Sequence, residues 1–359
     1  MRIILASGQF APARSGYSTV ATNLFHEFEH AGHSVEIITE GKGCRRIGKV
    51  FTLTPDARRM IRSGVDIVQI IGPSPLFTEQ LVKVATSSGT ISSYNLFAFA
   101  GLSTYYGGPL SKLVDTLYVH TLLSRALRHA GVLIVPTHDF ARSLGPLQSK
   151  CAVIPLGVAD PCLTGPTTIR TPGDGPGTEI LKVLFVGQLR RYKGIPVLLN
   201  AVALLKTSGR RLRLTIVGEG PDRPVLERTV GRLGIKENVI FRGALDDTAL
   251  HTEYLSNDVL VLPSLFGESF GLVLVEAALH GLKVVASDLA GVREVVRDLG
   301  GSLIPVGDAK ALGGTLGDLS PLRPEDRRLV PSITSRYSWP QVAARYVEAY
   351  RQAARRPSG

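Results

Sequence analysis

The chain has 359 residues, enough for two domains of ordinary size, and its 44% hydrophobic and 20% charged residues are typical of a globular protein. No run of 18 apolar residues is present, so we expect no membrane-spanning helix. The net charge of +11 is spread over both halves without a basic block or an aromatic-basic ladder, which argues against a nucleic-acid-binding module. Anionic substrates or anionic lipid remain compatible with this charge.

Three cysteines, Cys44, Cys151 and Cys162, show no CxxC spacing. Their arrangement predicts buried thiols in a reducing compartment rather than disulfides or zinc ligands. We therefore expect a cytoplasmic protein.

The first half alternates short apolar runs with helical patterns, which predicts a doubly wound α/β sheet. The predicted strands are Arg2 to Ala6, Val35 to Thr39, Ile67 to Ile71, Thr90 to Tyr94, Val132 to Pro136 and Ala152 to Pro155. The predicted helices are Ser18 to Ala31, Leu76 to Thr86 and Leu110 to Ala130.

Residues 164–178 are rich in Pro, Gly and Thr, which is typical of a linker. A second α/β alternation follows, with strands at Lys182 to Val186, Arg213 to Val217, Val239 to Phe241, Val259 to Leu262, Val284 to Ala286 and Ser302 to Ile304. A final helix, Trp339 to Ala354, carries an aromatic face. The predicted domains are therefore residues 1–163 and 179–336, and residues 337–359 are expected to pack back on the first domain.

Two glutamates, Glu268 and Glu276, follow the buried strand that ends at Leu262. Glu268 is expected in the loop after the strand, and Glu276 one turn into a helix that Gly281 ends. The carboxyl edge of a parallel sheet is where open α/β folds bind ligands, and helix-opening amides favour an anion such as phosphate. Carboxylates beside an anion site suggest recognition of sugar hydroxyls, whereas the simpler interpretation is a capped helix with a solvated Glu268.

Five motifs in order resemble the retaining GT-B glycosyltransferases of glycosyltransferase family 4. They are Val186-Gly187-Gln188-Leu189 with Lys193-Gly194, Ile216-Val217-Gly218-Glu219-Gly220-Pro221, Asn238 to Gly243, the EX7E spacing of Glu268 and Glu276, and Gly301 to Asp308. The resemblance is best over about residues 180–310. It implies two Rossmann-like domains that face each other across a cleft, a nucleotide-sugar donor and a hydroxyl acceptor.

The resemblance also implies roles for individual residues. Glu276 would bind the ribose and Glu268 the sugar, while the amides of Phe270, Gly271 and Leu272 would hold the sugar and phosphates. Lys193 would neutralise the diphosphate, where negative charge grows as the sugar leaves. Gln188, Gly220 and Arg242 would lie by the nucleotide, and Gly16 would let the first domain approach the diphosphate. Because the chain has no DxD triplet, we expect no metal requirement.

The chain departs from the family pattern at three positions, one of which is the strand Asp66 to Ile71, where the histidines of the family's DxVHxH strand are absent. The family commonly has Arg where Gln188 stands, so Lys193, Arg190 or Arg191 would carry more of the positive charge. The family's active-site histidine in the first domain is also absent, and its position aligns with Tyr94 or Asn95. Asn95 can hydrogen-bond a sugar hydroxyl but cannot titrate near neutral pH.

The acceptor is not readable from the sequence. The basic segment Leu110 to Ala130 suggests peripheral contact with anionic membrane and a lipid-linked or polysaccharide acceptor, although a core-packed helix would look the same. UDP-sugars are the commonest donors of the family and GDP-mannose is next. Two alternatives stay open: a nucleotide-sugar isomerase or hydrolase, and a non-catalytic nucleotide-sugar-binding protein or inactive partner subunit of a heteromeric transferase.

Overall fold

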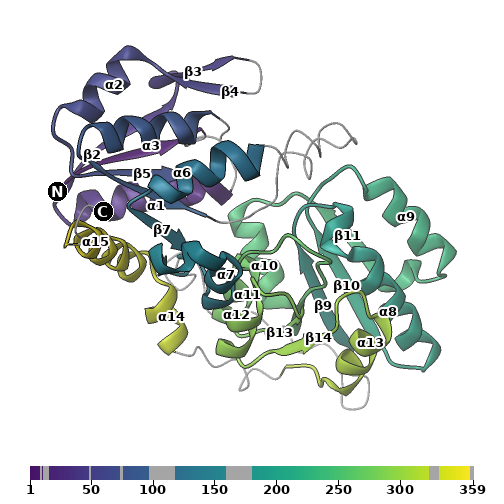
Figure 1. Cartoon of the computed structure of the whole chain (residues 1–359). Helices are drawn as coiled ribbons and strands as arrows, with labels where there is room; N and C mark the ends of the chain where they lie inside the picture. The colour runs from purple at the N-terminus through teal and green to yellow at the C-terminus, as the bar shows by residue number, and fades with distance from the viewer. Residues whose placement is uncertain are drawn as a thin grey trace. The chain divides into compact units, whose positions relative to one another are not determined.

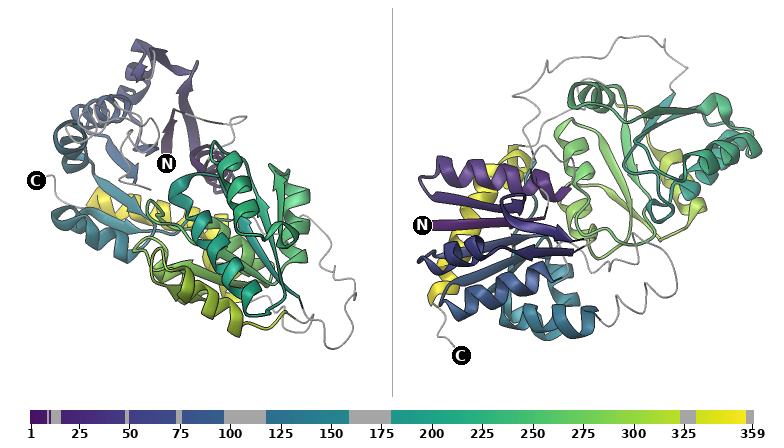
Figure 2. Two further views of the ribbon diagram at one scale, coloured as in Figure 1. Left: turned by 90° about the vertical axis from the view of Figure 1, so that its right-hand side faces the viewer. Right: turned by 90° about the horizontal axis from the view of Figure 1, so that it is seen from above.

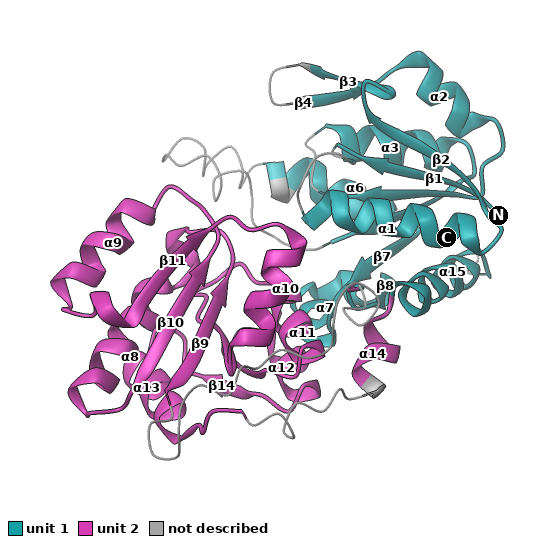
Figure 3. Cartoon of the chain, turned by 180° about the vertical axis from the view of Figure 1, so that it is seen from behind, with its two compact units in different colours: residues 1–157, 339–359 teal, residues 158–338 magenta. Residues whose placement is uncertain are grey.

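The computed structural model describes residues 1–8, 10, 16–47, 50–72, 76–96, 118–158, 180–322 and 331–355. The chain divides into two compact units, unit 1 with residues 1–157 and 339–359, and unit 2 with residues 158–338 (Figure 3). The expected linker at 164–178 and Cys162 lie outside the described residues. Each unit is an α/β layer structure in which helices pack on a mainly parallel sheet, as the sequence predicted (Figure 1).

The described residues of unit 1 form an 8-stranded sheet in the order β4-β3-β2-β1-β5-β6-β7-β8. All its paired strands are parallel except β3 and β4. The strands are β1 (Arg2–Ser7), β2 (Ser34–Glu40), β3 (Gly43–Ile47), β4 (Val50–Leu53), β5 (Ile67–Ile71), β6 (Ile91–Asn95), β7 (Val132–Val135) and β8 (Cys151–Val153).

The helices of unit 1 lie between these strands and after the second unit. They are α1 (Gly16–His30), α2 (Pro55–Arg62), α3 (Phe77–Ser87), α6 (Ser124–His129), α7 (His138–Ser143) and α15 (Trp339–Arg355). A π-helical turn, η1 (Val119–Leu123), precedes α6. The predicted helix from Leu110 is thus present from residue 118 on, and residues 110–117 lie outside the described ranges. The sequence analysis missed β3, β4, α2 and α7.

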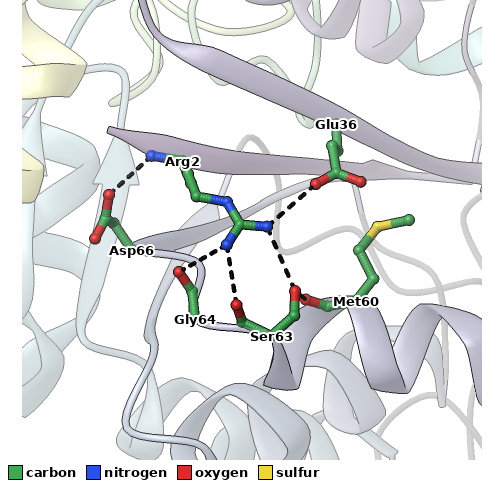
Figure 4. Close-up of polar contacts among 6 residues, drawn as sticks. All are labelled: Arg2, Glu36, Met60, Ser63, Gly64 and Asp66. Atoms are coloured by element: carbon green, nitrogen blue, oxygen red, sulfur yellow. Dashed lines mark hydrogen bonds and ion pairs between the residues drawn. The ribbon is translucent and has the colours of Figure 1, made fainter.

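Arg2 connects the amino-terminal ends of β1, β2 and β5 in unit 1 (Figure 4). The Arg2 guanidinium donates to the carbonyl of Ser63 (2.9 Å), and the Arg2 amide donates to Asp66 Oδ2 (2.8 Å). These bonds join the start of β1 to the turn between α2 and β5, and Glu36 on β2 pairs with the same guanidinium at 3.8 Å. Arg2 therefore has a structural role at the sheet edge opposite to the one where ligands are expected.

The last helix packs into unit 1 although it follows unit 2 in the sequence. In Figure 2 the yellow helix α15 runs beside the purple helix α1, and it also contacts β6 and β7. Its predicted aromatic face, Trp339, Tyr346 and Tyr350, is buried. Tyr350 Oη donates to Gln69 Oε1 (2.7 Å), Gln69 Nε2 donates to Asn95 Oδ1 (3.0 Å), and Asn95 Nδ2 bonds Tyr346 Oη (2.8 Å). This fully buried polar chain joins α15 to β5 and β6.

The described residues of unit 2 form a 6-stranded parallel sheet in the order β11-β10-β9-β12-β13-β14. The strands are β9 (Leu181–Val186), β10 (Leu212–Val217), β11 (Val239–Gly243), β12 (Val259–Leu262), β13 (Lys283–Ser287) and β14 (Ser302–Ile304). The helices include α8 (Ile195–Thr207), α9 (Arg223–Arg232), α10 (Asp247–Ser256), α11 (Leu272–Leu279), α12 (Arg293–Asp298), α13 (Ala309–Asp318) and α14 (Pro331–Tyr337).

The winding direction of unit 2 reverses between β9 and β12. The chain first adds β10 and β11 on one side of β9, then crosses to β12 and continues outward to β14. Such a switch point leaves a crevice at the carboxyl ends of the two central strands, where open α/β sheets bind ligands. No helix in the described parts of the chain is both long and apolar enough to cross a bilayer.

The buried network of unit 1 predicts the effect of Tyr350→Phe. The change leaves Gln69 Oε1 without its donor in a dry core, so we expect unit 1 to lose about 1–3 kcal/mol of unfolding free energy. The single tryptophan of the chain, Trp339, is buried in unit 1, so its fluorescence during denaturant unfolding reports on this unit. Tyr337→Phe is the control, because Tyr337 donates to the partly exposed Asp298 in unit 2 (3.2 Å). An equal shift of the Trp339 transition in both variants would contradict the role of the network.

Candidate functional site

The residues predicted to bind a donor in unit 2 follow the strands at the switch point. The loop after β9 carries Gln188 and Lys193, and the loop after β12 carries Glu268. These two loops are bonded to each other, because the Leu265 amide donates to the carbonyl of Tyr192 (2.7 Å). The site is therefore built on the two central strands of the sheet.

Lys193 and Glu268 form a direct ion pair. Lys193 Nζ lies 2.5 Å from Glu268 Oε1, and the two side chains are 16% and 10% exposed. Ser264 Oγ donates to the same oxygen of Glu268 (2.7 Å). The resemblance assigned the lysine and the glutamate to different parts of a donor, and the structure brings them together into one mostly buried polar group.

Close backbone contact between the loops explains the glycine of the Lys193-Gly194 motif. Gly194 has a left-handed φ of +67°, and a Cβ on it would lie 1.9 Å from the carbonyl oxygen of Pro263. No other residue fits this position without moving a loop. Gly220 is also at a close approach, since a Cβ there would lie 2.4 Å from the carbonyl oxygen of Leu189. Gly220 thus brings the loop after β10 against the loop after β9.

Helix α11 begins at the same edge of the sheet. Gly271, its N-cap, has a left-handed φ of +79°, and Phe270 is buried with its ring 5.9 Å from that of Tyr337. Phe270 can therefore serve a ligand only through its backbone. Among the described residues, no hydrogen bond occupies the amides of Phe270, Gly271 and Leu272, which leaves them available to an anion.

Two further predicted nucleotide contacts lie in the loop after β9 and on β11, which are separated in the sheet by β10. Gln188 is exposed, and its Oε1 accepts from Arg190 Nε (3.2 Å), so a guanidinium lies beside the position where the resemblance called for arginine. Arg242 is the extra residue in a bulge of β11, where the register shifts past Ile216. Its guanidinium pairs with Glu253 on α10 (2.8 Å).

Glu276 lies in α11 in a less polar environment than Glu268. Its Oε2 accepts a hydrogen bond of 2.6 Å from Tyr254 Oη on α10. Burial raises the pKa of the Glu276 carboxyl, and Asp247 raises it further, while the bond from Tyr254 acts in the opposite direction. The structure therefore separates the two predicted carboxylates into one that is paired with a cation and one that is not.

Asn95 is a correction to the predicted site in unit 1. It is the last residue of β6, its side chain is 0% exposed, and Gln69 and Tyr346 bond both of its polar atoms. A side chain in this environment has no surface for a sugar hydroxyl. Asn95 therefore supports the fold of unit 1, and its side chain is not open to a ligand.

Gly16, predicted to lie near the diphosphate, is the first residue of α1. A Cβ on it would meet nothing within 4 Å. The space around Gly16 within the described residues does not by itself require glycine. Its predicted contact with a diphosphate stays a prediction.

The sequence analysis missed several residues that complete the site. Ser264 lies four residues before Glu268 in the loop after β12. Tyr254 lies on α10, the helix that precedes β12. Tyr254 stacks on His280 with ring centroids 4.7 Å apart, and His280 contacts His251 (2.8 Å between ring nitrogens). The spacing of His251 and Tyr254, one turn apart on one helix, was the available signal.

The sequence of residues 175–333 matches the family described as Glycosyl transferases group 1. The chain carries a glycosyl transferases group 1 domain. Its matched part contains every predicted donor-binding residue of unit 2.

Relatives extend this likeness beyond the domain. Phosphatidyl-myo-inositol mannosyltransferase of Mycobacterium leprae is 35% identical over 228 residues, which cover 61% of this chain and 59% of that protein. The chain thus spans less than two thirds of the length of this relative.

Solved structures resemble the chain over almost its whole length. Sucrose-phosphate synthase of Thermosynechococcus elongatus has a TM-score of 0.69 at 22% identity and covers 98% of both chains. The Anabaena protein HepE, in complex with UDP and glucose, has a TM-score of 0.67 at 16% identity and covers 98% of this chain and 100% of its own. At these identities the likeness establishes the fold, which is GT-B, as the sequence predicted.

The loop contact at Gly194 predicts the effect of an added methyl group. Gly194→Ala should destabilise unit 2 by more than the about 1–2 kcal/mol that a left-handed backbone alone costs, because the Cβ would collide with Pro263. Gly209→Ala is the matched control, since Gly209 has a φ of +79° and open space around it. Thermal unfolding of both variants measures the difference, and equal losses would contradict the collision.

The environment of Glu276 predicts a pH-dependent stability. The pKa of Glu276 in the folded state is raised above the ordinary value of 4.5. The protonated carboxyl group therefore contributes to the unfolding free energy below pH 4.5, and this contribution is lost as pH rises through the folded-state pKa. Glu276→Gln, without ligand, should match the wild type in acid and exceed it in unfolding free energy near neutral pH. Glu237→Gln, an exposed position of unit 2, is the control. A variant that is less stable than the wild type only at neutral pH would contradict the raised pKa.

Proposed function

We propose that the chain is a retaining, metal-independent glycosyltransferase that moves a sugar from a nucleotide-sugar to a hydroxyl of a glycan or glycolipid acceptor. The observation that carries this proposal is the Lys193–Glu268 ion pair beside the amino end of α11. It combines a cation and open amides for a diphosphate with a carboxylate for sugar hydroxyls, at the switch point of a parallel sheet. The glycosyl transferases group 1 match supports the same reaction class.

The proposed donor lies along the carboxyl edge of unit 2. Glu276 accepts from the ribose hydroxyls, and the amides of Phe270, Gly271 and Leu272 bind the phosphates together with Lys193. Glu268 accepts from the sugar, while Gln188, Gly220 and Arg242 lie by the nucleotide. A UDP-sugar is the first choice, supported by the UDP bound to HepE, and GDP-mannose is the second, supported by the mannosyltransferase relative.

In the proposed reaction, the bond between the anomeric carbon and the diphosphate oxygen breaks on the same face on which the acceptor oxygen bonds. The leaving phosphate takes the proton of the acceptor hydroxyl. Lys193 and the helix-start amides stabilise the charge that develops on the diphosphate, which is the role a divalent ion has in other transferases. The position of these positive groups is what supports the proposed metal independence.

One observation favours a second candidate, a nucleotide-sugar-binding protein without transferase activity or an inactive partner subunit. The position where the resemblance calls for a histidine is occupied by the buried Tyr94 and Asn95, neither of which can exchange a proton near neutral pH. Release of nucleotide from the donor distinguishes the candidates. A transferase hydrolyses its donor slowly without acceptor, whereas a binding protein returns it intact.

The first test is thermal unfolding with UDP-, GDP- and ADP-sugars, with and without EDTA. A ligand that binds only the folded state adds about 2.7 kcal/mol at roughly 100 times its Kd, which is readily measured. We expect one nucleotide family to raise the unfolding temperature equally in both conditions, and Glu276→Ala to abolish the shift. A shift that EDTA removes would contradict metal independence, and no shift at all would contradict the donor site.

Lys193→Ala tests the proposed charge stabilisation. We expect turnover to fall about 10²–10³-fold, because the diphosphate loses its cation, with a smaller effect on donor binding. Release of nucleotide from the bound donor measures turnover. Lys310→Ala, at an exposed position on α13, should leave turnover unchanged. Equal turnover in Lys193→Ala and the wild type would contradict the role of Lys193.

A further inference from the structure

We propose that Tyr254 is a positioning residue for donor binding, and that it acts by holding the Glu276 carboxylate in its ribose-binding orientation with His280 and His251 behind it. This inference rests on the proposed function, because it assumes that Glu276 receives the ribose. It adds three side chains that the family resemblance did not assign, two on α10 and one at the C-cap of α11.

The contact between Tyr254 and Glu276 is short and sheltered. Tyr254 is 2% exposed, and its Oη donates to Glu276 Oε2 at 2.6 Å. A phenol that donates to a carboxylate fixes the plane of the carboxyl group and leaves the other oxygen for a ligand. The same bond favours the ionised form of Glu276, which is the form that accepts from two hydroxyls.

The phenol ring is held in place by His280. The two rings stack with centroids 4.7 Å apart and planes 25° apart. His280 Nδ1 lies 2.7 Å from the backbone carbonyl of Glu276, and since a carbonyl oxygen can only accept, this nitrogen carries a proton. His280 is thereby anchored to the same helical turn as the carboxylate that it helps to position.

His251 completes the group from α10. Its Nδ1 lies 2.8 Å from His280 Nε2, so with a neutral His280 the proton of this bond belongs to His251. His251 Nε2 is then an acceptor, and this buried nitrogen has no hydrogen-bond partner among the described residues. The chain from His251 through His280 to Tyr254 therefore cross-links α10 to α11 directly behind Glu276.

The charged surroundings of Glu276 indicate what the loss of Tyr254 would change. Burial of the carboxyl group raises the pKa of Glu276, and the charge of Asp247 raises it further. The hydrogen bond from Tyr254 lowers this pKa. Without the phenol, Glu276 would become protonated at a higher pH. Ribose-dependent affinity, which is gained as pH rises through this pKa, would then appear only at higher pH.

The test measures binding of UDP and GDP, and of their dideoxyribose analogues, by calorimetry over the acid to neutral range. In the wild type we expect the natural nucleotide to bind more tightly than its analogue. In Tyr254→Phe this preference should fall roughly tenfold, as expected for loss of a bond to a charged group. The pH at which half of the preference has developed, which is its pH midpoint, should rise. Tyr337→Phe, which removes another tyrosine bonded to a carboxylate of unit 2, should change neither quantity.

The outcomes separate the inference from the proposed function. If the wild type prefers the natural nucleotide and Tyr254→Phe retains the full preference and pH midpoint, the positioning role is overturned while the donor site stands. If the wild type shows no preference, the ribose assignment of Glu276 fails and both are overturned. Should Tyr254→Phe not fold, His280→Phe keeps the ring stack without the two nitrogen bonds. An unchanged ribose preference and pH midpoint in that variant would overturn the proposal in the same way.

Discussion

The candidate site depends on the contact between the two loops that leave β9 and β12. Gly194 lies directly against the carbonyl of Pro263, and the Leu265 amide bonds to Tyr192. This contact brings Lys193 and Glu268 to 2.5 Å although they are 75 residues apart in the sequence. Because both loops begin at the ends of buried strands, the sheet positions the loops, and the contact between the loops holds the ion pair.

The two glutamates of the EX7E motif show how environment divides similar groups. Glu268 lies next to a lysine and a serine, so its charge is balanced within the protein. Glu276 has a phenol as its hydrogen-bond partner, and burial raises its pKa. A carboxylate without a cation keeps acceptor capacity for a neutral polyol such as ribose, whereas one beside a cation suits the region where sugar meets phosphate.

Elements with one clear pattern were predictable from the sequence. The buried runs of β5 and β12, which are apolar except for Gln69, were placed at their observed bounds, because a strand buried on both faces needs no alternation. The antiparallel pair β3 and β4 was missed, since its strands are short and carry the polar residues Arg45 and Arg46. Asn95 was misjudged for another reason: it ends a strand at the ligand-binding edge, but Tyr346, 251 residues away, bonds its side chain in the core.

The sequence by itself determined the fold class, the motifs that resemble glycosyltransferase family 4 and the edge of the sheet at which they lie. The fold class and the edge follow from local periodicity and the motifs from their resemblance to a family, and both are read from residues that are neighbours in the sequence. Only the tertiary structure decided which side chains meet: Lys193 with Glu268, Tyr254 with Glu276, and Asn95 with the last helix. Such pairs join distant segments, and their distances depend on how whole helices and strands pack, which no local pattern encodes.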